Sequence, residues 1–205
     1  KKIIFICILD VYIQDGVVEI LIQLYIEMKL LKNKKKGILF WITGLSGSGK
    51  TTIAKKIKSD IRKHYGPTLL VSGDNLRKIF NFNKYSYEER VLLAKKFCKF
   101  AKFITDQKIN LIFAVVGMMH SSRKWYRKNI DNYVEIYIKA DLNKIIKLKR
   151  KKIYHKKKIG DIVGIKIKPE FPKNPHIIIN NDFKKNIEEL SDELINKLKK
   201  KYAPR

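Results

Sequence analysis

Short apolar runs alternate with longer stretches of helical periodicity along most of this chain. From residue 37 onward, near-continuous apolar runs predict five strands, over 37–43, 68–73, 110–117, 132–140 and 176–180. Apolar residues at helical spacing predict six helices, over 49–66, 74–80, 86–107, 121–130, 141–151 and 186–202. Ser86, with Glu89 three residues later, and Asp141 are the residue types that cap helix N-termini. Both are therefore expected to begin helices.

The alternation of strands with helices predicts an α/β fold of three layers. Strands that are apolar on both faces are buried on both faces, so we expect a mostly parallel five-stranded sheet with helices on either side. The stretch 151–175 is basic and contains three prolines. It is too irregular for a core element and is predicted to be a functional or mobile surface loop.

Length and composition favour one globular domain. The chain has 205 residues, of which 45% are hydrophobic, so it can bury a sizeable core. Its two cysteines, Cys7 and Cys98, lie in no metal or redox spacing, which fits a reduced, cytoplasmic setting. Cys98 falls on the apolar side of a predicted helix and is expected in the core. No run approaches the roughly 20 apolar residues of a membrane span, so no membrane partner is expected.

The formal net charge of +27 is extreme and admits several explanations. It fits a nucleic-acid partner, an anionic membrane surface or small polyanionic substrates attracted by the field. Because Lys, Ile and Asn are all frequent, much of the charge can equally be a solvated surface that reflects coding bias. Charge alone therefore decides nothing about function.

Residues 1–27 differ in character from the rest of the chain. They carry strand-like alternation and acids at Asp10, Asp15 and Glu19, which interrupt any signal-peptide pattern. Met28 then opens a stretch typical of a cytoplasmic start. We hypothesise that 1–27 is an upstream extension or a gene-model artefact and that 28–205 is the functional domain. Removal of 1–27 should then leave stability and activity unchanged.

The sequence "GLSGSGKTT" marks a phosphate-binding loop. Residues 44–51 fit G-x-x-x-x-G-K-[ST], between a predicted buried strand and a predicted helix. Backbone N–H groups of such a loop cradle phosphates, the lysine bridges the β- and γ-phosphates, and the hydroxyl binds Mg²⁺. We therefore predict that ATP and Mg²⁺ bind here. The predicted nucleotide-binding residues are Gly44, Leu45, Ser46, Gly47, Ser48, Gly49, Lys50, Thr51 and Thr52.

Asp74 follows the second predicted strand in "SGDNLR", at the sheet edge where ligands of α/β proteins bind. A carboxylate there can hold Mg²⁺ with Thr51 or accept a proton from an attacking hydroxyl. It can also simply cap the next helix. We predict a catalytic role for Lys50 and Asp74, and a metal-binding role for Thr51 and Asp74.

Several motifs in order resemble the adenylyl-sulfate kinase family, over about residues 37–180. These are "GLSGSGKTT", "GDNLR", "SYEER" (family F-S-x-x-D-R), "YVEIYIKADL", "IYHKKKIGDI" (family L-Y-K-K-A-R-x-G-E-I) and "PKNP" (family P-E-N-P). The resemblance implies a P-loop kinase that phosphorylates the 3′-hydroxyl of adenylyl sulfate with ATP. It implies a small-molecule nucleotide acceptor, and because relatives are often dimers, it allows a homodimer.

The resemblance also assigns roles to individual residues. Asp74 becomes the catalytic base or magnesium partner, and Arg77 and Arg90 contact the anionic groups of the acceptor. Tyr85 takes the place of the aromatic that stacks on the acceptor base, and Lys156 that of a basic lid residue. The stretch 149–175 is then a lid that closes over the nucleotides.

The family pattern is broken on the acceptor side. Leu93 stands where the family has asparagine, "VVGMMH" replaces I-S-P-[YF]-R, and the lid's K-D-F-T-G is shortened to "VG". Leu148 replaces an arginine expected at the donor base, for which Arg150 can compensate. His120 falls at the family's arginine position and is predicted to contact substrate phosphate.

The phosphate-handling residues, which match the family pattern, predict phosphoryl transfer. The residues that differ from the pattern leave the identity of the acceptor undecided. Adenylyl sulfate is the first expectation. Relatives of this family act on cytidine diphosphoramidate in capsule modification, and a pyrimidine needs less of the aromatic clamp, so this is the alternative. A P-loop nucleic-acid-binding protein is a third interpretation, but no RNP, zinc-finger or helix-turn-helix motif supports it, and no specific nucleic acid is expected.

Overall fold

A computed structural model of the chain describes residues 36–82, 86–148 and 162–202. Strands and helices alternate, as the apolar pattern predicts. The strands are β1 (Leu39–Thr43), β2 (Thr68–Ser72), β3 (Asn110–Ala114), β4 (Tyr133–Lys139) and β5 (Ile177–Asn180). The helices are α3 (Lys50–Tyr65), α4 (Gly73–Ile79), α5 (Tyr87–Asp106), α6 (His120–Asn129), α7 (Leu142–Lys147) and α8 (Ile187–Lys201).

The five strands form one parallel sheet in the order β2-β3-β1-β4-β5. The connection from β1 through α3 to β2 runs to one side of β1, and the chain then crosses β1 to reach β4. In open sheets of this kind, ligands bind beyond the carboxyl ends of the strands at the place where the strand order reverses. The topology therefore directs attention to the loops that follow β1 and β3.

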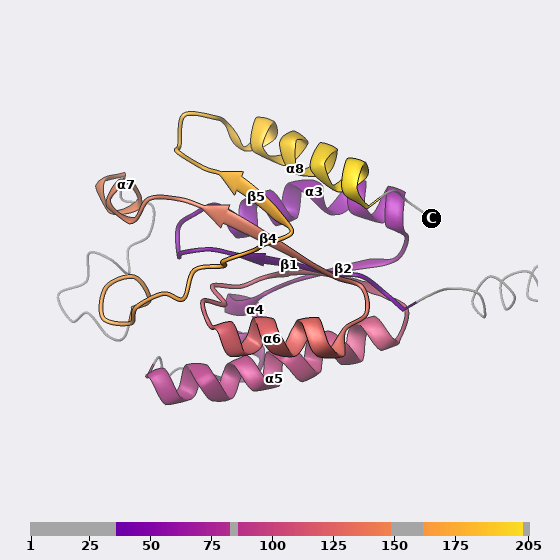
Figure 1. Ribbon diagram of the computed structural model, residues 1–205, viewed down its shortest axis with the longest axis horizontal. Coiled ribbons are helices and arrows are strands. Elements are labelled where there is room, and N and C mark those ends of the chain that lie inside the picture. Colours follow the sequence, from indigo (N-terminus) through magenta and orange to yellow (C-terminus); the bar gives the residue numbers. More distant parts are fainter. Residues whose placement is uncertain (1–35, 83–85, 149–161, 203–205) are drawn as a thin grey trace, which may run out of the picture. The chain divides into compact units, whose positions relative to one another are not determined.

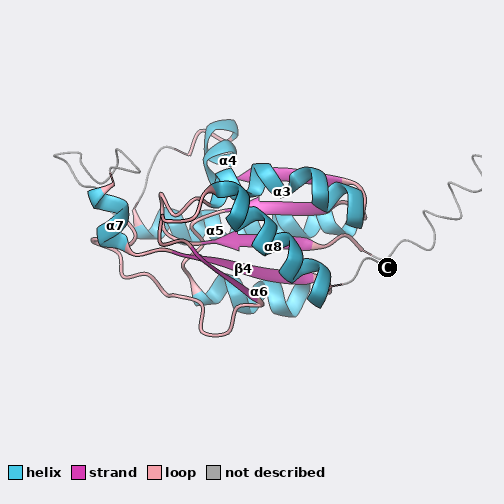
Figure 2. Cartoon of the chain, turned by 90° about the horizontal axis from the view of Figure 1, so that it is seen from above, coloured by secondary structure: helices cyan, strands magenta, loops and turns pink. Residues whose placement is uncertain are grey.

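Helices cover both faces of the sheet, which confirms the predicted three layers (Figures 1 and 2). On one face α3 and α8 enclose a core with Ile53, Ile57 and Leu194. On the other, α5 and α6 enclose an aromatic-rich core that includes Trp41 and Phe113. The central strands are buried on both faces because each face has its own helices.

Local signals at the helix ends agree with the prediction. The Ser86 hydroxyl accepts a hydrogen bond from the Glu89 backbone N–H at 3.3 Å, and an Asp141 carboxylate oxygen accepts one from Lys144 N–H at 2.8 Å. Cys98 is buried in the core, as expected. No helix in the described ranges is long and apolar enough to cross a membrane.

Two predicted elements differ in extent. β3 ends at Ala114, short of the expected Gly117, because the chain turns away from the sheet to line a cavity. The part of the predicted lid that is described, 162–175, contains a short bridge between Val163 and Ile167 and otherwise irregular chain. Residues 149–161 of that lid, and the extension 1–27, lie outside the described residues.

Candidate functional site

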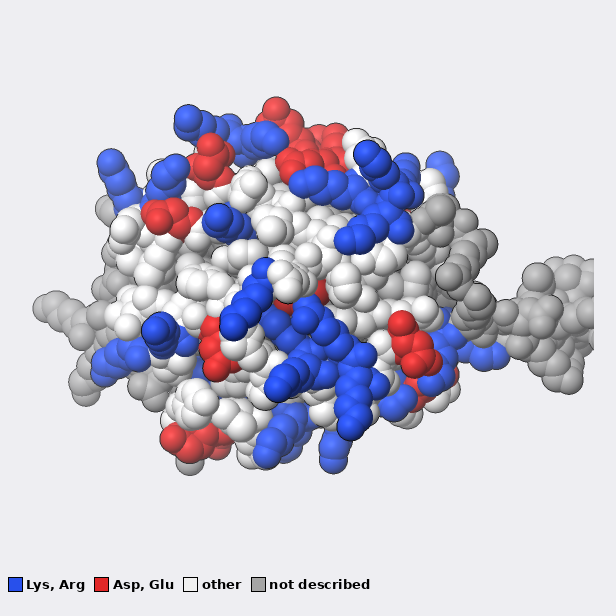
Figure 3. Space-filling view, viewed as in Figure 1, with Lys and Arg blue, Asp and Glu red and all other residues white. Residues whose placement is uncertain are grey.

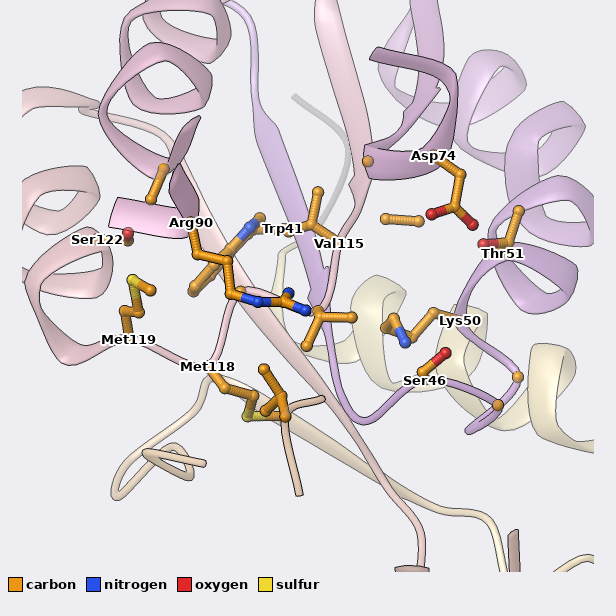
Figure 4. A pocket seen from close by; sticks show the side chains of 18 of the residues that line it. Trp41, Ser46, Lys50, Thr51, Asp74, Arg90, Val115, Met118, Met119 and Ser122 are labelled. Carbon is orange, nitrogen blue, oxygen red and sulfur yellow. The ribbon is translucent and has the colours of Figure 1, made fainter. Parts of the chain in front are cut away.

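One large cavity lies beyond the carboxyl ends of β1 and β3. Its volume is about 710 Å³, within the range of small-molecule sites. The glycine loop forms one end, and the chain after β3 forms the other (Figure 4). Residues from the glycine loop, α4, α5 and the 162–175 segment all contribute to its walls. The cavity is therefore assembled from the segments that carry the sequence motifs.

The loop Gly44–Gly49 is shaped by close backbone packing. A Cβ atom at Gly44 would lie 2.6 Å from the backbone oxygen of Ile138, a distance that only glycine avoids. The Lys50 ammonium donates to the Leu45 carbonyl at 2.6 Å, within its own loop. Of the nine predicted nucleotide-binding residues, the structure places six in the cavity wall: Ser46, Gly47, Gly49, Lys50, Thr51 and Thr52.

A residue that the sequence reasoning missed supports the loop from behind. The buried Asn181 follows β5 and donates through Nδ2 to the Ser48 carbonyl at 3.0 Å. Its own Oδ1 accepts from Phe183 N–H at 3.0 Å, and both Asn181 and Phe183 line the cavity. The signal was faint: one polar residue after an apolar strand.

Asp74 lies in the first turn of α4 and faces the cavity. The structure assigns the cap of this helix to Ser72, whose hydroxyl accepts from Asn75 N–H at 3.2 Å, so Asp74 is not the N-cap. The Asp74 carboxylate and the Thr51 hydroxyl point toward one another (Figure 4). Oxygen atoms of these two kinds suit Mg²⁺, which takes one or two protein ligands plus phosphate and water.

Two arginines from different helices also reach the cavity. Arg90 extends from α5 across it toward the glycine loop (Figure 4). Arg77 lies on α4 and donates to the Phe82 carbonyl at 3.3 Å. The structure thus brings Lys50, Asp74 and both arginines to one cavity, which is the juxtaposition that phosphoryl transfer requires.

The end of the cavity away from the glycine loop carries Met118, Met119 and Ser122 (Figure 4). The apolar residues Leu93, Phe97 and Trp41 also line the cavity. Burial raises the pKa of the hydroxyl of Tyr126, another lining residue, well above its ordinary value.

Gly117 is a position that the neighbouring tryptophan restricts. It has φ +49°, and a Cβ atom there would lie 2.4 Å from the Trp41 ring. The serine of the family pattern would not fit this arrangement.

His120 is placed differently from the prediction. Its ring lies beside Arg123, with Nδ1 3.2 Å from Nη1, and His120 is not among the residues that line the cavity. Its contact with substrate phosphate stays a prediction. Leu148 is half exposed and also lies outside the cavity wall. Tyr85 and Lys156, like Arg150, fall outside the described residues, so their predicted roles stay predictions.

Comparison with known proteins agrees with this geometry. The family model described as adenylylsulphate kinase matches residues 36–180. A cytidine diphosphoramidate kinase of Campylobacter jejuni is 35% identical over 168 residues, which cover 80% of this chain and 98% of that protein. An adenylyl-sulfate kinase of Clostridium kluyveri is 31% identical over 161 residues, which cover 76% and 81%.

Solved structures show the same relationship. The APS kinase of Mycobacterium tuberculosis, in complex with AMPPNP and APS, matches with a TM-score of 0.69 and 25% identity. The match covers 80% of this chain and 99% of that one.

Proposed function

Because the chain belongs to the adenylyl-sulfate kinase family and is an ATP-dependent phosphotransferase, we propose that it phosphorylates the 3′-hydroxyl of a small activated nucleotide, cytidine diphosphoramidate. One observation carries this proposal. The cavity keeps the family's phosphate-handling residues at the glycine loop and has Met118 and Met119 at the opposite end, where the family pattern has proline and an aromatic residue (Figure 4). The residues that handle the donor phosphates are thus retained, whereas the residues expected around the acceptor have changed.

The donor end supports a conventional arrangement of ATP. The loop's N–H groups and Lys50 would bind the β- and γ-phosphates. Thr51 would hold Mg²⁺, and Asp74 would reach the ion through water, which leaves its carboxylate able to accept a proton. The chemistry that Mg²⁺ would supply there is positive charge beside the phosphates. Arg90 extends toward the same place and would stabilise negative charge on that group.

Transfer then follows from the position of Asp74. The 3′-oxygen of the acceptor forms a bond to the γ-phosphorus as the bond from that phosphorus to the β–γ bridging oxygen breaks. ADP leaves with the bridging oxygen. The hydroxyl proton passes to the Asp74 carboxylate, which faces the cavity beside Thr51. The products are ADP and a nucleotide 3′-phosphate.

The acceptor end supports a cytidine compound over adenylyl sulfate. Leu93 and Gly117 line the cavity where the family pattern has asparagine and serine, so two polar side chains expected around the acceptor are absent. A lost hydrogen bond to a charged group costs about 1.5–3 kcal/mol, enough to change substrate preference. The relative matched over 98% of its length acts on cytidine diphosphoramidate.

Adenylyl sulfate is the second candidate. Relatives at 31% identity and the solved complex with APS favour it.

We propose further that residues 28–205 form the kinase domain, with 1–27 as an extension, and that the protein works in the cytoplasm, where ATP is available.

The test is an ADP-release assay with ATP, Mg²⁺ and each acceptor in turn. We expect turnover with cytidine diphosphoramidate at a higher kcat/KM than with adenylyl sulfate, and loss of turnover in Lys50→Ala. Lys124 is an exposed residue on α6, and Lys124→Gln is the matched control. Its turnover should equal that of the wild type. Preference for adenylyl sulfate would overturn the acceptor assignment, and turnover with neither would overturn both.

A further inference from the structure

A buried acid lies in the middle of β4. Glu135 has no exposed surface, and its two carboxylate oxygens accept from different arginines of α6. Arg123 Nε donates to Oε1 at 2.8 Å, and Arg127 Nη2 donates to Oε2 at 2.7 Å. Arg123 is itself buried. A buried ion pair is weak evidence that the pair stabilises the fold, because the cost of desolvation offsets much of the attraction. The other contacts of the two arginines therefore indicate what the pair does.

Both arginines also reach past Glu135 to the same stretch of chain. Arg123 Nη1 donates to the Glu170 carbonyl at 2.6 Å, and Arg127 Nη2 donates to the Asn174 carbonyl at 2.9 Å. The guanidinium group has several donors in a rigid fork, so one arginine can satisfy a carboxylate and a carbonyl together. One buried glutamate therefore orients two arginines that hold residues 170–174 by their backbone.

The same stretch is joined to the chain that follows β3. Glu170 N–H donates to the Met118 carbonyl at 3.2 Å, and the Glu170 carboxylate accepts from His120 N–H at the start of α6. Arg123 Nη2 also lies 3.4 Å from the Gly117 carbonyl. These contacts tie together two segments that are about fifty positions apart in the sequence.

The segments joined in this way form a wall of the cavity. Gly117, Met118, Lys168 and Glu170 line it, and Met118, to which Glu170 is hydrogen-bonded, lies at the end away from Thr51 (Figure 4). Glu135, Arg123 and Arg127 are absent from that lining. Their effect on a bound acceptor would therefore pass through the wall that they hold.

We propose that Glu135, Arg123 and Arg127 form a positioning network that fixes the acceptor-side wall of the cavity. The inference rests on the proposed function, because it takes the acceptor to bind at this end. It gives His120 an indirect role as well, since its ring packs beside Arg123 and its N–H is engaged by Glu170. Because Asn181 and α3 support the donor end, we expect that end to be changed less than the acceptor-side wall.

The discriminating variant is Arg123→Lys, which keeps the positive charge beside Glu135 but cannot hold the carboxylate and the Glu170 carbonyl in one fork. Misplacement of the wall by a fraction of an ångström should raise the acceptor KM by about 10- to 100-fold. The KM for ATP should change by less than about twofold. Arg127→Lys should act in the same direction through Asn174.

Two measurements separate positioning from stability. Leu198→Ala truncates a buried residue of α8 on the opposite face of the sheet and serves as a destabilised control. It should lower the melting temperature without changing either KM. Hydrogen exchange should speed up over 167–174 in Arg123→Lys and stay unchanged over α3.

These outcomes decide the inference. If both KM values rise together, or if Arg123→Lys lowers only the melting temperature, the network is merely structural and the inference is wrong. If the wild-type protein turns over neither acceptor, the proposed function fails. Hydrogen exchange still tests the network in that case, because unchanged exchange over 167–174 would overturn it without any acceptor.

Discussion

At the scale of single residues, Asp74 illustrates how a helix cap can free a functional group. Ser72 satisfies the first turn of α4, so the Asp74 carboxylate faces the cavity and the Thr51 hydroxyl. The sequence allowed either a capping or a catalytic role for this residue. The cap contact excludes the first and leaves the second as our proposal.

The variant Asp74→Asn tests that role. It keeps the shape of the side chain but removes the negative charge that would accept a proton and bind Mg²⁺. We expect kcat to fall by about 10²- to 10⁴-fold, the usual contribution of a general base, with ATP binding retained. Steady-state kinetics and nucleotide titration measure the two quantities. The neighbouring Asn75→Asp keeps Asp74 and serves as the control, and equal kcat values for wild type and Asp74→Asn would refute the assignment.

Gly117→Ser tests whether the family's residue can be restored. The new Cβ atom would lie 2.4 Å from the buried Trp41 ring, at φ +49°, so ring or backbone must shift. We expect a loss of about 1–3 kcal/mol in the free energy of unfolding, as for other overpacked sites. Denaturant titration measures it, with the exposed α6 residue Ser121→Ala as control. A variant as stable as wild type would show that this site can relax.

At the scale of elements, the sequence predicted the order and type of the strands and helices because each repeats its apolar residues at a clear period. The caps Ser86 and Asp141 were also predictable, since a cap acts within four residues. The Glu135 network was not, because its arginines and the carbonyls of 170–174 come from separate segments. Only the acid inside the apolar stretch "YVEIYIK" hinted at it. The apolar cavity wall likewise required tertiary structure.

The contact between β4 and His176, the residue before β5, predicts a pH effect on stability. His176 Nδ1 accepts from Glu135 N–H at 2.8 Å, which requires an unprotonated nitrogen. Burial, and then the charges of Arg127 and Lys201, lower the pKa of His176 below its ordinary value of 6.5. The unfolded chain therefore binds a proton first as pH falls, so stability from this group is complete above the unfolded pKa and is lost progressively below it.

The measurement is the free energy of unfolding between neutral and mildly acidic pH. His176→Asn removes the titration and can keep an acceptor for Glu135 N–H, so its stability should fall less steeply with decreasing pH than that of wild type. Ser121→Ala, which removes no titratable group and lies exposed on α6, is the control and should keep the wild-type slope. Equal slopes for wild type and His176→Asn would contradict the expectation.

At the scale of the whole molecule, charge is the dominant feature. Lys and Arg are distributed over the face seen in Figure 3, with a dense group near its centre, and Asp and Glu lie among them. With a net charge of +27, the protein should attract anionic nucleotides over several ångströms. Attraction of the nucleotide substrates is therefore a function of the charge that requires no nucleic-acid partner.

The dependence of kcat/KM on ionic strength tests whether the charge attracts the acceptor. We expect kcat/KM for the acceptor to fall by about tenfold or more between roughly 0.05 and 0.5 M salt, as screening shortens the reach of the field. The value of kcat should change little, because it concerns the bound complex. A neutral-salt series at fixed pH measures this. If kcat/KM does not change with salt concentration, the charge is a solvated surface with no role in attracting the acceptor. Tight binding to generic RNA whose affinity falls steeply with salt concentration would support the nucleic-acid interpretation instead.

The central claim is the identity of the acceptor, and a direct competition tests it. Cytidine diphosphoramidate and adenylyl sulfate are supplied in equal concentration with limiting ATP and Mg²⁺, and the two 3′-phosphorylated products are counted by mass spectrometry. Their ratio equals the ratio of the two kcat/KM values, whatever the total activity. Our account predicts an excess of the cytidine product. An excess of 3′-phosphoadenylyl sulfate would contradict it.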